Sequence, residues 1–324
     1  MSRKNIKRIK QEPESYGNEP KQFPKVALRA NSTNKIHNVK QNIQKRTFKN
    51  RVNRQPLTEQ VKTPINFIDH LPKTQKDVCF VIGGGPSLNG FDFTLLNGCD
   101  TIAVNKSVEY ISNPTYFVTT DYSYFVKASL PISQINQKVY KSYFIANMSH
   151  SYMEIQKEQV VDTRRNFVYE DLYHYDGVIQ SYNKTGFGSD ISEFSHGENS
   201  GHCGIQLALL MGYKKIYLLG FDLNSGGQTH FHQSYREIDQ ASFKKRVNTY
   251  AGTLLQSLAK HNGGQEIINL SSSSILTQSP NTIKTETFKD VLVEHGVKHR
   301  EVTKGENRTL NNLMVVGYYT VNTP

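Results

Sequence analysis

The sequence contains no apolar run long enough to cross a membrane, and no apolar segment follows its basic first residues. Its longest apolar stretches have only the length of a β-strand. A membrane-spanning helix needs about 20 apolar residues, and a secretory signal needs an apolar segment of roughly 7 to 15. We therefore expect a cytoplasmic protein without a transmembrane segment.

Cysteine is scarce as well. The three cysteines, Cys79, Cys99 and Cys203, are odd in number, and their spacing matches no common metal-binding motif. This count disfavours a disulfide-stabilised extracellular domain and a structural zinc site. A reducing compartment is the simpler interpretation.

Acidic residues are rare at the N-terminus. Residues 1–60 contain 15 Lys and Arg against 4 Glu and no Asp, which accounts for the whole formal charge of +11. Aliphatic residues are scattered there without a helix or strand period, so we predict a disordered basic tail and linker over residues 1–70. Such a tail would bind nucleic acid, another polyanion or an anionic membrane surface in a salt-dependent way. A solvated tail without a specific role is an equally good interpretation.

The segment from 71 to 280 alternates strand and helix patterns. Unbroken apolar runs are typical of parallel strands that are buried on both faces. We predict a variant Rossmann-like α/β fold with three layers and a mainly parallel sheet, followed by a C-terminal extension over 281–324 that packs on this domain. The expected strands are 78–82, 101–104, 116–121, 140–146, 166–169 and 216–219, and the expected helices are 91–96, 199–212 and 237–261.

The first expected strand runs into a glycine turn, Gly83-Gly84-Gly85-Pro86-Ser87. Glycines allow a tight turn, and a proline in the first turn of a helix leaves the next N–H groups facing a bound phosphate. The spacing is incomplete, because Leu88 stands where a Rossmann fingerprint needs its third glycine and no Gly-Lys-Ser/Thr follows. A purely structural turn is the alternative.

Other polar residues follow the remaining expected strands. Asn105 stands where a dinucleotide fold usually has an acidic residue, which disfavours NAD; its amide would read a ribose or a base edge, or cap a turn. In open α/β sheets, ligands bind beyond the carboxyl ends of the strands. We therefore predict one nucleotide-binding crevice formed by Gly83, Gly84, Gly85, Pro86, Ser87, Asn105, Asp121, Ser200, Gly201 and Asp222.

Two histidines, His230 and His232, lie in a loop that follows Asp222. In an extended segment both would point to one face, where one would act as a general base. We favour His232 slightly, because it lies nearer the next helix. They would alternatively bind a metal together with Asp222, or be ordinary loop residues. The pair Arg164 and Arg165 would meet a phosphate or be plain surface charge.

Taken together, these motifs resemble the superfamily shared by bacterial family 42 glycosyltransferases, which are sialyltransferase-like, and MptE-like 6-hydroxymethylpterin diphosphokinases. The resemblance rests on residues 83–88, Asn105 and residues 199–222, and it covers about residues 77–275. The histidine loop resembles versions of this domain found in bacteriophage genomes, which would place the protein in the host cytoplasm.

The resemblance implies a nucleotide-dependent transferase that moves a sugar from a nucleotide-activated donor to a hydroxyl acceptor. A loop histidine would be the base, and seven residues would contact the nucleotide: Gly83, Gly85, Pro86, Ser87, Asn105, Ser200 and Gly201. The diphosphokinase members imply ATP and Mg²⁺ instead, with Asp222 as a metal ligand. A non-enzymatic module that binds a nucleotide or nucleic acid is a third hypothesis. The oligomeric state stays open.

Overall fold

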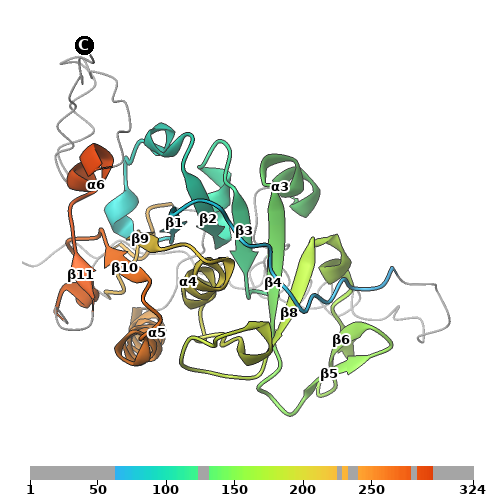
Figure 1. Cartoon of the computed structure of the whole chain (residues 1–324). Helices are drawn as coiled ribbons and strands as arrows, with labels where there is room; N and C mark the ends of the chain where they lie inside the picture. The colour runs from blue at the N-terminus through green and yellow to red at the C-terminus, as the bar shows by residue number, and fades with distance from the viewer. Residues whose placement is uncertain (1–62, 123–130, 225–227, 233–239, 279–282, 295–324) are drawn as a thin grey trace, which may run out of the picture. The chain divides into compact units, whose positions relative to one another are not determined.

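The structure, a computed structural model, describes residues 63–122, 131–224, 228–232, 240–278 and 283–294 (Figure 1). The chain divides into two units, Met1–Val61 and Lys62–Pro324, and all described residues belong to the second. The predicted tail up to residue 62 and the end of the C-terminal extension from 295 lie outside the described residues. In the part described, no helix is long and apolar enough to cross a membrane.

An eight-stranded parallel sheet forms the centre of the described residues, with the order β11-β10-β9-β1-β2-β3-β4-β8. The α/β fold with a parallel sheet is therefore confirmed. Strand β1 pairs with β2 on one side and with β9 on the other, so the strand order reverses at β1. The strands are β1 Val78–Ile82, β2 Asp100–Val104, β3 Tyr116–Thr119, β4 Lys141–Asn147, β8 Gly177–Ser181, β9 Lys215–Leu219, β10 Glu266–Asn269 and β11 Lys284–Thr285.

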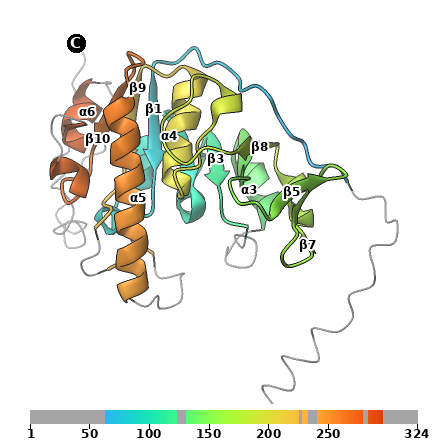
Figure 2. The same cartoon turned by 90° about the horizontal axis from the view of Figure 1, so that it is seen from below.

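Helices cover both faces of this sheet. Helices α4 (Ser200–Met211) and α5 (Gln240–Lys260) lie on one face, and α3 (Ile132–Lys138) and α6 (Phe288–Glu294) lie on the other (Figures 1 and 2). Successive side chains of a strand point to opposite faces of the sheet. In β1, Phe80 and Ile82 therefore pack in the core on one face, and Cys79 and Val81 pack in the core on the other. This alternation explains why the strand sequences are apolar throughout.

Helix α4 begins and ends where the sequence predicts. The side chain of Asn199 accepts a hydrogen bond from the N–H of His202 at 2.8 Å, and Gly212 closes the helix in the left-handed conformation with φ 93°. Within the helix, a Cβ on Gly204 would lie 2.9 Å from the side chain of Val81. The glycine therefore lets α4 approach β1 closely.

The elements after β1 differ from the prediction. Pro86 begins a 3₁₀ turn, Pro86–Leu88, rather than an α-helix, because Asn89 and Gly90, with φ 73°, turn the chain away. The helix predicted at 91–96 is another 3₁₀ turn. The described 3₁₀ turns are Pro86–Leu88, Phe93–Leu96, Asn105–Glu109, Glu170–His174, Ile191–Glu193 and Ile275–Gln278.

A small antiparallel sheet is inserted between β4 and β8. It consists of β5 (Met153–Gln156), β6 (Gln159–Asp162) and β7 (Phe167–Val168) and lies beside β8 at one end of the main sheet (Figure 1). The strand predicted at 166–169 thus belongs to this separate hairpin layer. The chain before residue 70 is already part of this fold. Ile65 is buried, and Phe67 forms an isolated parallel β-bridge with Val178 of β8.

Candidate functional site

The glycine turn joins the carboxyl ends of β1 and β9. The N–H of Gly83 donates to the carbonyl of Leu219, and the N–H of Gly85 donates to the carbonyl of Gly220, both at 2.8 Å. A Cβ on Gly83 or on Gly85 would lie 2.6 Å from the Gly220 oxygen. These two positions therefore need glycine because two backbones meet there.

The carboxylate of Asp222 fills the space that we predicted for a phosphate. Its Oδ2 accepts a hydrogen bond from the N–H of Ser87 at 2.9 Å, and its Oδ1 accepts one from the hydroxyl of Ser273 at 2.8 Å. The side chain is buried, and a Cβ on Gly85 would lie only 1.9 Å from Oδ2. Three N–H groups of the turn thus bond within the protein, so they are not held open for an anion.

This arrangement does not fit a Mg²⁺ site at Asp222. Both carboxylate oxygens accept hydrogen bonds from the protein, and a magnesium ion needs further oxygen ligands around it. Among the described residues, no group of three or more His, Cys, Asp and Glu side chains is arranged to hold a metal.

Asn105 directly follows β2 in an unusual backbone conformation. Its φ is 52°, in the left-handed region that few residues other than glycine adopt, and asparagine is one of those few. The hydroxyl of Thr119 donates to its side-chain oxygen at 2.7 Å. Next to it, Lys106 is buried and lies 3.6 Å from Glu109. This lysine was not predicted from the sequence, although a charge so soon after an apolar strand is a detectable signal.

The histidine loop lies on the glycine turn. The N–H of Phe231 donates to the carbonyl of Gly84 at 3.1 Å, and a Cβ on Gly84 would lie 3.2 Å from the ring of His230. The rings of His230 and His232 stack with their centroids 5.2 Å apart. The structure therefore places His230 against Gly84, with His232 stacked on His230, at the point where the strand order reverses.

Both histidines are neutral at pH 7. Burial, and then the charge of Arg246, lowers the pKa of His230 from 6.5 to about 4. Burial, and then the charges of His230 and Lys106, lowers the pKa of His232 to about 4 as well. A neutral imidazole can accept a proton, so either ring has the protonation state of a general base.

The two rings differ in their access to solvent. His232 is buried and faces the ring of Tyr110, with centroids 6.0 Å apart, and it also contacts Phe231. His230 is only partly buried and lies 5.9 Å from the ring of Phe243 on α5. Among the described residues, His230 is therefore more exposed than His232.

Ser200 and Thr120 connect the start of α4 to the end of β3. The hydroxyl of buried Ser200 accepts a hydrogen bond from the N–H of Thr120 at 3.0 Å and lies 3.0 Å from the Thr120 hydroxyl. Gly201 lets the helix approach the chain after β9, since a Cβ there would lie 2.9 Å from the ring of Phe221. Asp121 is partly buried and follows Thr120 in the chain. The pKa of the nearby Tyr250 is raised, mainly by burial and to a smaller extent by the charges of Glu198 and Asp121.

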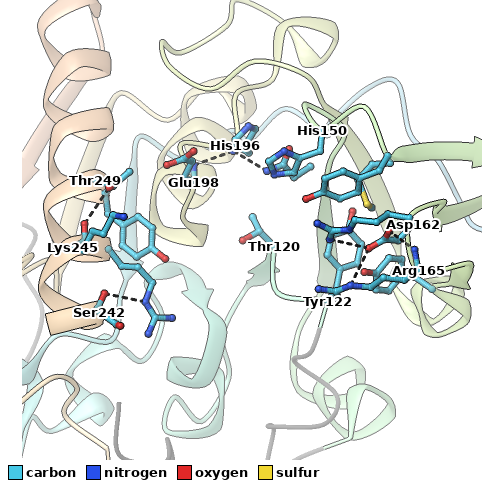
Figure 3. A pocket seen from close by; sticks show the side chains of 17 residues that line it. Thr120, Tyr122, His150, Asp162, Arg165, His196, Glu198, Ser242, Lys245 and Thr249 are labelled. Atoms are coloured by element: carbon cyan, nitrogen blue, oxygen red, sulfur yellow. Dashed lines mark hydrogen bonds and ion pairs between the residues drawn. The ribbon is translucent and has the colours of Figure 1, made fainter. Parts of the chain in front are cut away.

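Thr120 also borders a polar cavity of about 850 Å³ that the sequence did not reveal as one site (Figure 3). The cavity lies between the β5–β7 hairpin, α5 and the carboxyl ends of β3 and β4. Its lining residues are Thr120, Tyr122, Asn147, His150, Tyr152, Met153, Asp162, Arg164, Arg165, Tyr169, His196, Glu198, Ser242, Lys245, Arg246, Thr249 and Tyr250.

The cavity is linked to the histidine loop through α5 and to the start of α4 through Thr120. Arg246 lines the cavity, and its charge contributes to the low pKa of His230, which contacts Gly84. Thr120 lines the cavity too and is bonded to Ser200. Of the residues singled out from the sequence, Arg164 and Arg165 line the cavity, whereas those predicted for the nucleotide crevice do not.

No protein-family model and no curated protein matches the sequence. Among solved structures, the fold is similar to the sialyltransferase CstII from Campylobacter jejuni in complex with cytidine-5′-monophosphate, at 18% identity and a TM-score of 0.39 over 65% of this chain and 86% of that one. It is also similar to the MAf glycosyltransferase from Magnetospirillum magneticum AMB-1, at 13% identity and a TM-score of 0.38 over 70% of this chain and 36% of that one. The present chain thus spans about a third of the Magnetospirillum protein. The fold class rests on the strand order given above.

Proposed function

We propose that this protein is a nucleotide-dependent glycosyltransferase, which moves a sugar from a nucleotide-activated donor to a hydroxyl group of an acceptor. The observation that carries the proposal is the position of His230. His230, whose pKa is lowered to about 4, packs against Gly84 of the glycine turn and lies 5.9 Å from Phe243 of α5, the helix that carries the cavity residues Lys245 and Arg246. A neutral histidine near a cavity of substrate size can act as the base that transfer to a hydroxyl group needs.

The cavity has a suitable size and position for the donor. A volume of about 850 Å³ falls within the range of roughly 300 to 1,000 Å³ that is typical of small-molecule sites. It lies at the carboxyl ends of β3 and β4, on the same side of the sheet as the carboxyl end of β1, where the strand order reverses. We place the nucleotide between Asn105 and the start of α4 at Ser200 and Gly201. The motif resemblance to family 42 makes a cytidine nucleotide the first candidate.

In the proposed reaction, His230 removes the proton from the acceptor hydroxyl. The hydroxyl of Thr229 lies 3.0 Å from Nδ1 of His230 and helps to orient the ring. The acceptor oxygen forms a bond to the anomeric carbon of the sugar while the bond between that carbon and the donor phosphate oxygen breaks. The nucleotide leaves with the electron pair of the broken bond.

The first step of the test is a ligand screen. Purified protein is heated with CMP, UMP, GMP or AMP and with ATP plus Mg²⁺, because a ligand that binds the native state raises its melting temperature. We expect stabilisation by a cytidine nucleotide without added metal. Stabilisation by ATP and Mg²⁺ alone would favour pyrophosphoryl transfer instead.

The second step measures turnover with the matching nucleotide sugars. We expect His230→Ala to lower kcat by roughly 10²- to 10⁴-fold and to leave nucleotide affinity unchanged. His232→Ala tests the alternative base, and His70→Ala, at an exposed position outside the site, is the control. Full turnover in both loop variants would exclude a histidine base.

A further inference from the structure

We propose that the hairpin side of the cavity binds a negatively charged group of the acceptor, a sugar that carries a carboxylate or a phosphate, through Arg164 and Arg165. Calling the bound sugar the acceptor rests on the proposed glycosyltransferase function. The anion-binding site itself is argued only from the geometry of the cavity. The proposal assigns a substrate class to residues that do not belong to the glycine turn or the histidine loop.

Cationic side chains come from two opposite walls of the cavity. Arg164 and Arg165 lie in the turn between β6 and β7, and Lys245 and Arg246 project from α5. Figure 3 shows Lys245 and Arg165 on facing sides, with Thr120 between them. These four cations face two carboxylates in the lining, Asp162 and Glu198, and Glu198 is paired with Lys184 at 2.6 Å. The cavity therefore carries an excess of positive charge.

The two hairpin arginines are held in place by one buried carboxylate. Oδ2 of Asp162 lies 3.5 Å from Nη2 of Arg164 and 3.5 Å from Nε of Arg165, and its Oδ1 accepts the backbone N–H of Arg165 at 3.1 Å. The Arg164 guanidinium also sits 4.0 Å from the ring centroid of Tyr152. One negative charge thus orients two positive ones and leaves one positive charge in excess.

The arginines are oriented but still accessible. The side chain of Asp162 is only 2% exposed, whereas those of Arg164 and Arg165 are 53% and 66% exposed. Each guanidinium has five N–H donors in a planar fork that matches a carboxylate or a phosphate. At this exposure, both guanidinium groups are accessible to an anionic ligand in the cavity.

Aromatic rings beside the arginines favour a sugar over a bare ion. Tyr122, Tyr152 and Tyr169 line the same end of the cavity, and the rings of Tyr122 and Tyr169 lie 4.1 Å apart. Flat aromatic surfaces next to polar groups suit the apolar face and hydroxyl groups of a sugar ring. The combination fits a sugar with one charged substituent.

The position of the hairpin assigns this group to the acceptor. Strand β4 is three strands away from β1, which is roughly 14 Å at a strand spacing of about 4.8 Å. The nucleotide is placed near β1 to β3, so a group at the hairpin lies beyond the donor phosphate. It therefore belongs to the second substrate.

The experiment measures binding without turnover. Isothermal titration calorimetry compares glucuronate, glucose 6-phosphate, glucose and inorganic phosphate as probes of the full-length protein. We expect one or both acidic sugars to bind at least 10-fold more tightly than glucose and than inorganic phosphate. The tighter acidic sugar distinguishes a carboxylate site from a phosphate site.

Variants then locate the site. Arg164→Gln with Arg165→Gln should reduce acidic-sugar affinity at least 10-fold, while Lys214→Gln, which removes an exposed charge outside the cavity, should not. Because the double change leaves Asp162 without a cation, Arg165→Gln alone provides a milder variant and should lower the affinity in the same direction. Stabilisation by the nucleotide found in the ligand screen should be unchanged in all three.

Three results would overturn the proposal: equal binding of glucose and both acidic sugars, equal binding of inorganic phosphate and the acidic sugars, or unchanged acidic-sugar affinity in both arginine variants. Failure of the glycosyltransferase function would show instead as absent turnover with intact anion binding. The two failures are therefore distinguishable.

Discussion

The carboxylate of Asp222 accepts a hydrogen bond from the backbone N–H of Ser87 over 2.9 Å, across 135 positions of sequence. It thereby places a protein anion at the start of the 3₁₀ turn that follows β1. Ser273 donates a second hydrogen bond to the same carboxylate. The ends of β1 and β9 and the segment after β10 are thus held together beneath the histidine loop.

We expect Asp222→Ala to destabilise the protein by about 1.5 to 3 kcal/mol, the range for hydrogen bonds to a charged group whose partners are left buried. Urea unfolding followed by circular dichroism measures the change. Asp171→Ala, at an exposed aspartate, is the matched control and should change stability little. Equal stabilities of the two variants would show that the Asp222 contacts contribute nothing.

Gly84 and Gly85 should respond differently to alanine. A Cβ on Gly85 would meet the Asp222 carboxylate at 1.9 Å and a backbone oxygen at 2.6 Å, so we expect a loss of about 1 to 3 kcal/mol, as for an overpacked core. A Cβ on Gly84 would meet only the His230 ring, at 3.2 Å.

Gly84→Ala should therefore fold with near-normal stability and lower turnover by displacing His230. Urea unfolding and initial rates, measured on both variants, separate the two effects. Equal loss of stability in both variants would contradict this view of the turn.

The pH profile of the reaction should reflect the low pKa of His230. A base works while it is unprotonated, so the rate should hold through pH 6.5 and fall only toward pH 4, where the folded-state pKa lies. Arg246→Gln removes a positive charge that lowers this pKa, and the acidic limb should move to higher pH. Initial rates in buffers of constant ionic strength test both points. An acidic limb at the same pH in Arg246→Gln as in the wild type would show that Arg246 does not influence the pKa of the base.

Stability should decline as the pH falls from 6.5 to 4. Burial is the main cause that lowers the pKa of His196 to about 4 and of His202 to about 3. In this window the unfolded chain binds more protons than the native state, so the free energy of unfolding rises with pH and is lost on acidification. His196 also accepts the backbone N–H of Glu198 on Nδ1 at 3.0 Å, a bond that protonation breaks.

Melting temperatures between pH 7.5 and 4.5 measure this dependence. His202→Gln should flatten the slope relative to the wild type, while His70→Ala, at an exposed site, should leave it unchanged. A slope unaffected by His202→Gln would show that other groups cause the acid sensitivity.

Binding of polyanions should depend on the N-terminal segment. Residues 1–60 carry the whole formal charge of +11, so removing them should abolish salt-dependent binding to DNA. Fluorescence anisotropy at several salt concentrations compares the full chain with the truncated one. Equal affinity in both would assign DNA binding to the rest of the chain.

Local patterns predicted most of the sheet and α4. The apolar run of β1 and the Asn199 and Gly212 caps depend on residues only a few positions apart, and the structure confirms them. The same reasoning missed the β5–β6 hairpin, because one face of β5 is exposed and its short pattern is weak. The sequence also predicted the start of a helix at Pro86. The structure has only a 3₁₀ turn there, and Gly90, with φ 73°, turns the chain in another direction.

The sequence by itself determined the fold class, the position of the polar residues at the carboxyl ends of the strands, and the presence of two histidines in one loop. Tertiary structure alone decided that the N–H of Ser87 bonds to Asp222, that His230 is neutral, and that the hairpin and α5 enclose a basic cavity. The physical reason is range. Strand and cap patterns depend on near neighbours, whereas burial, pKa and the walls of a cavity depend on side chains that meet only after distant segments have packed together.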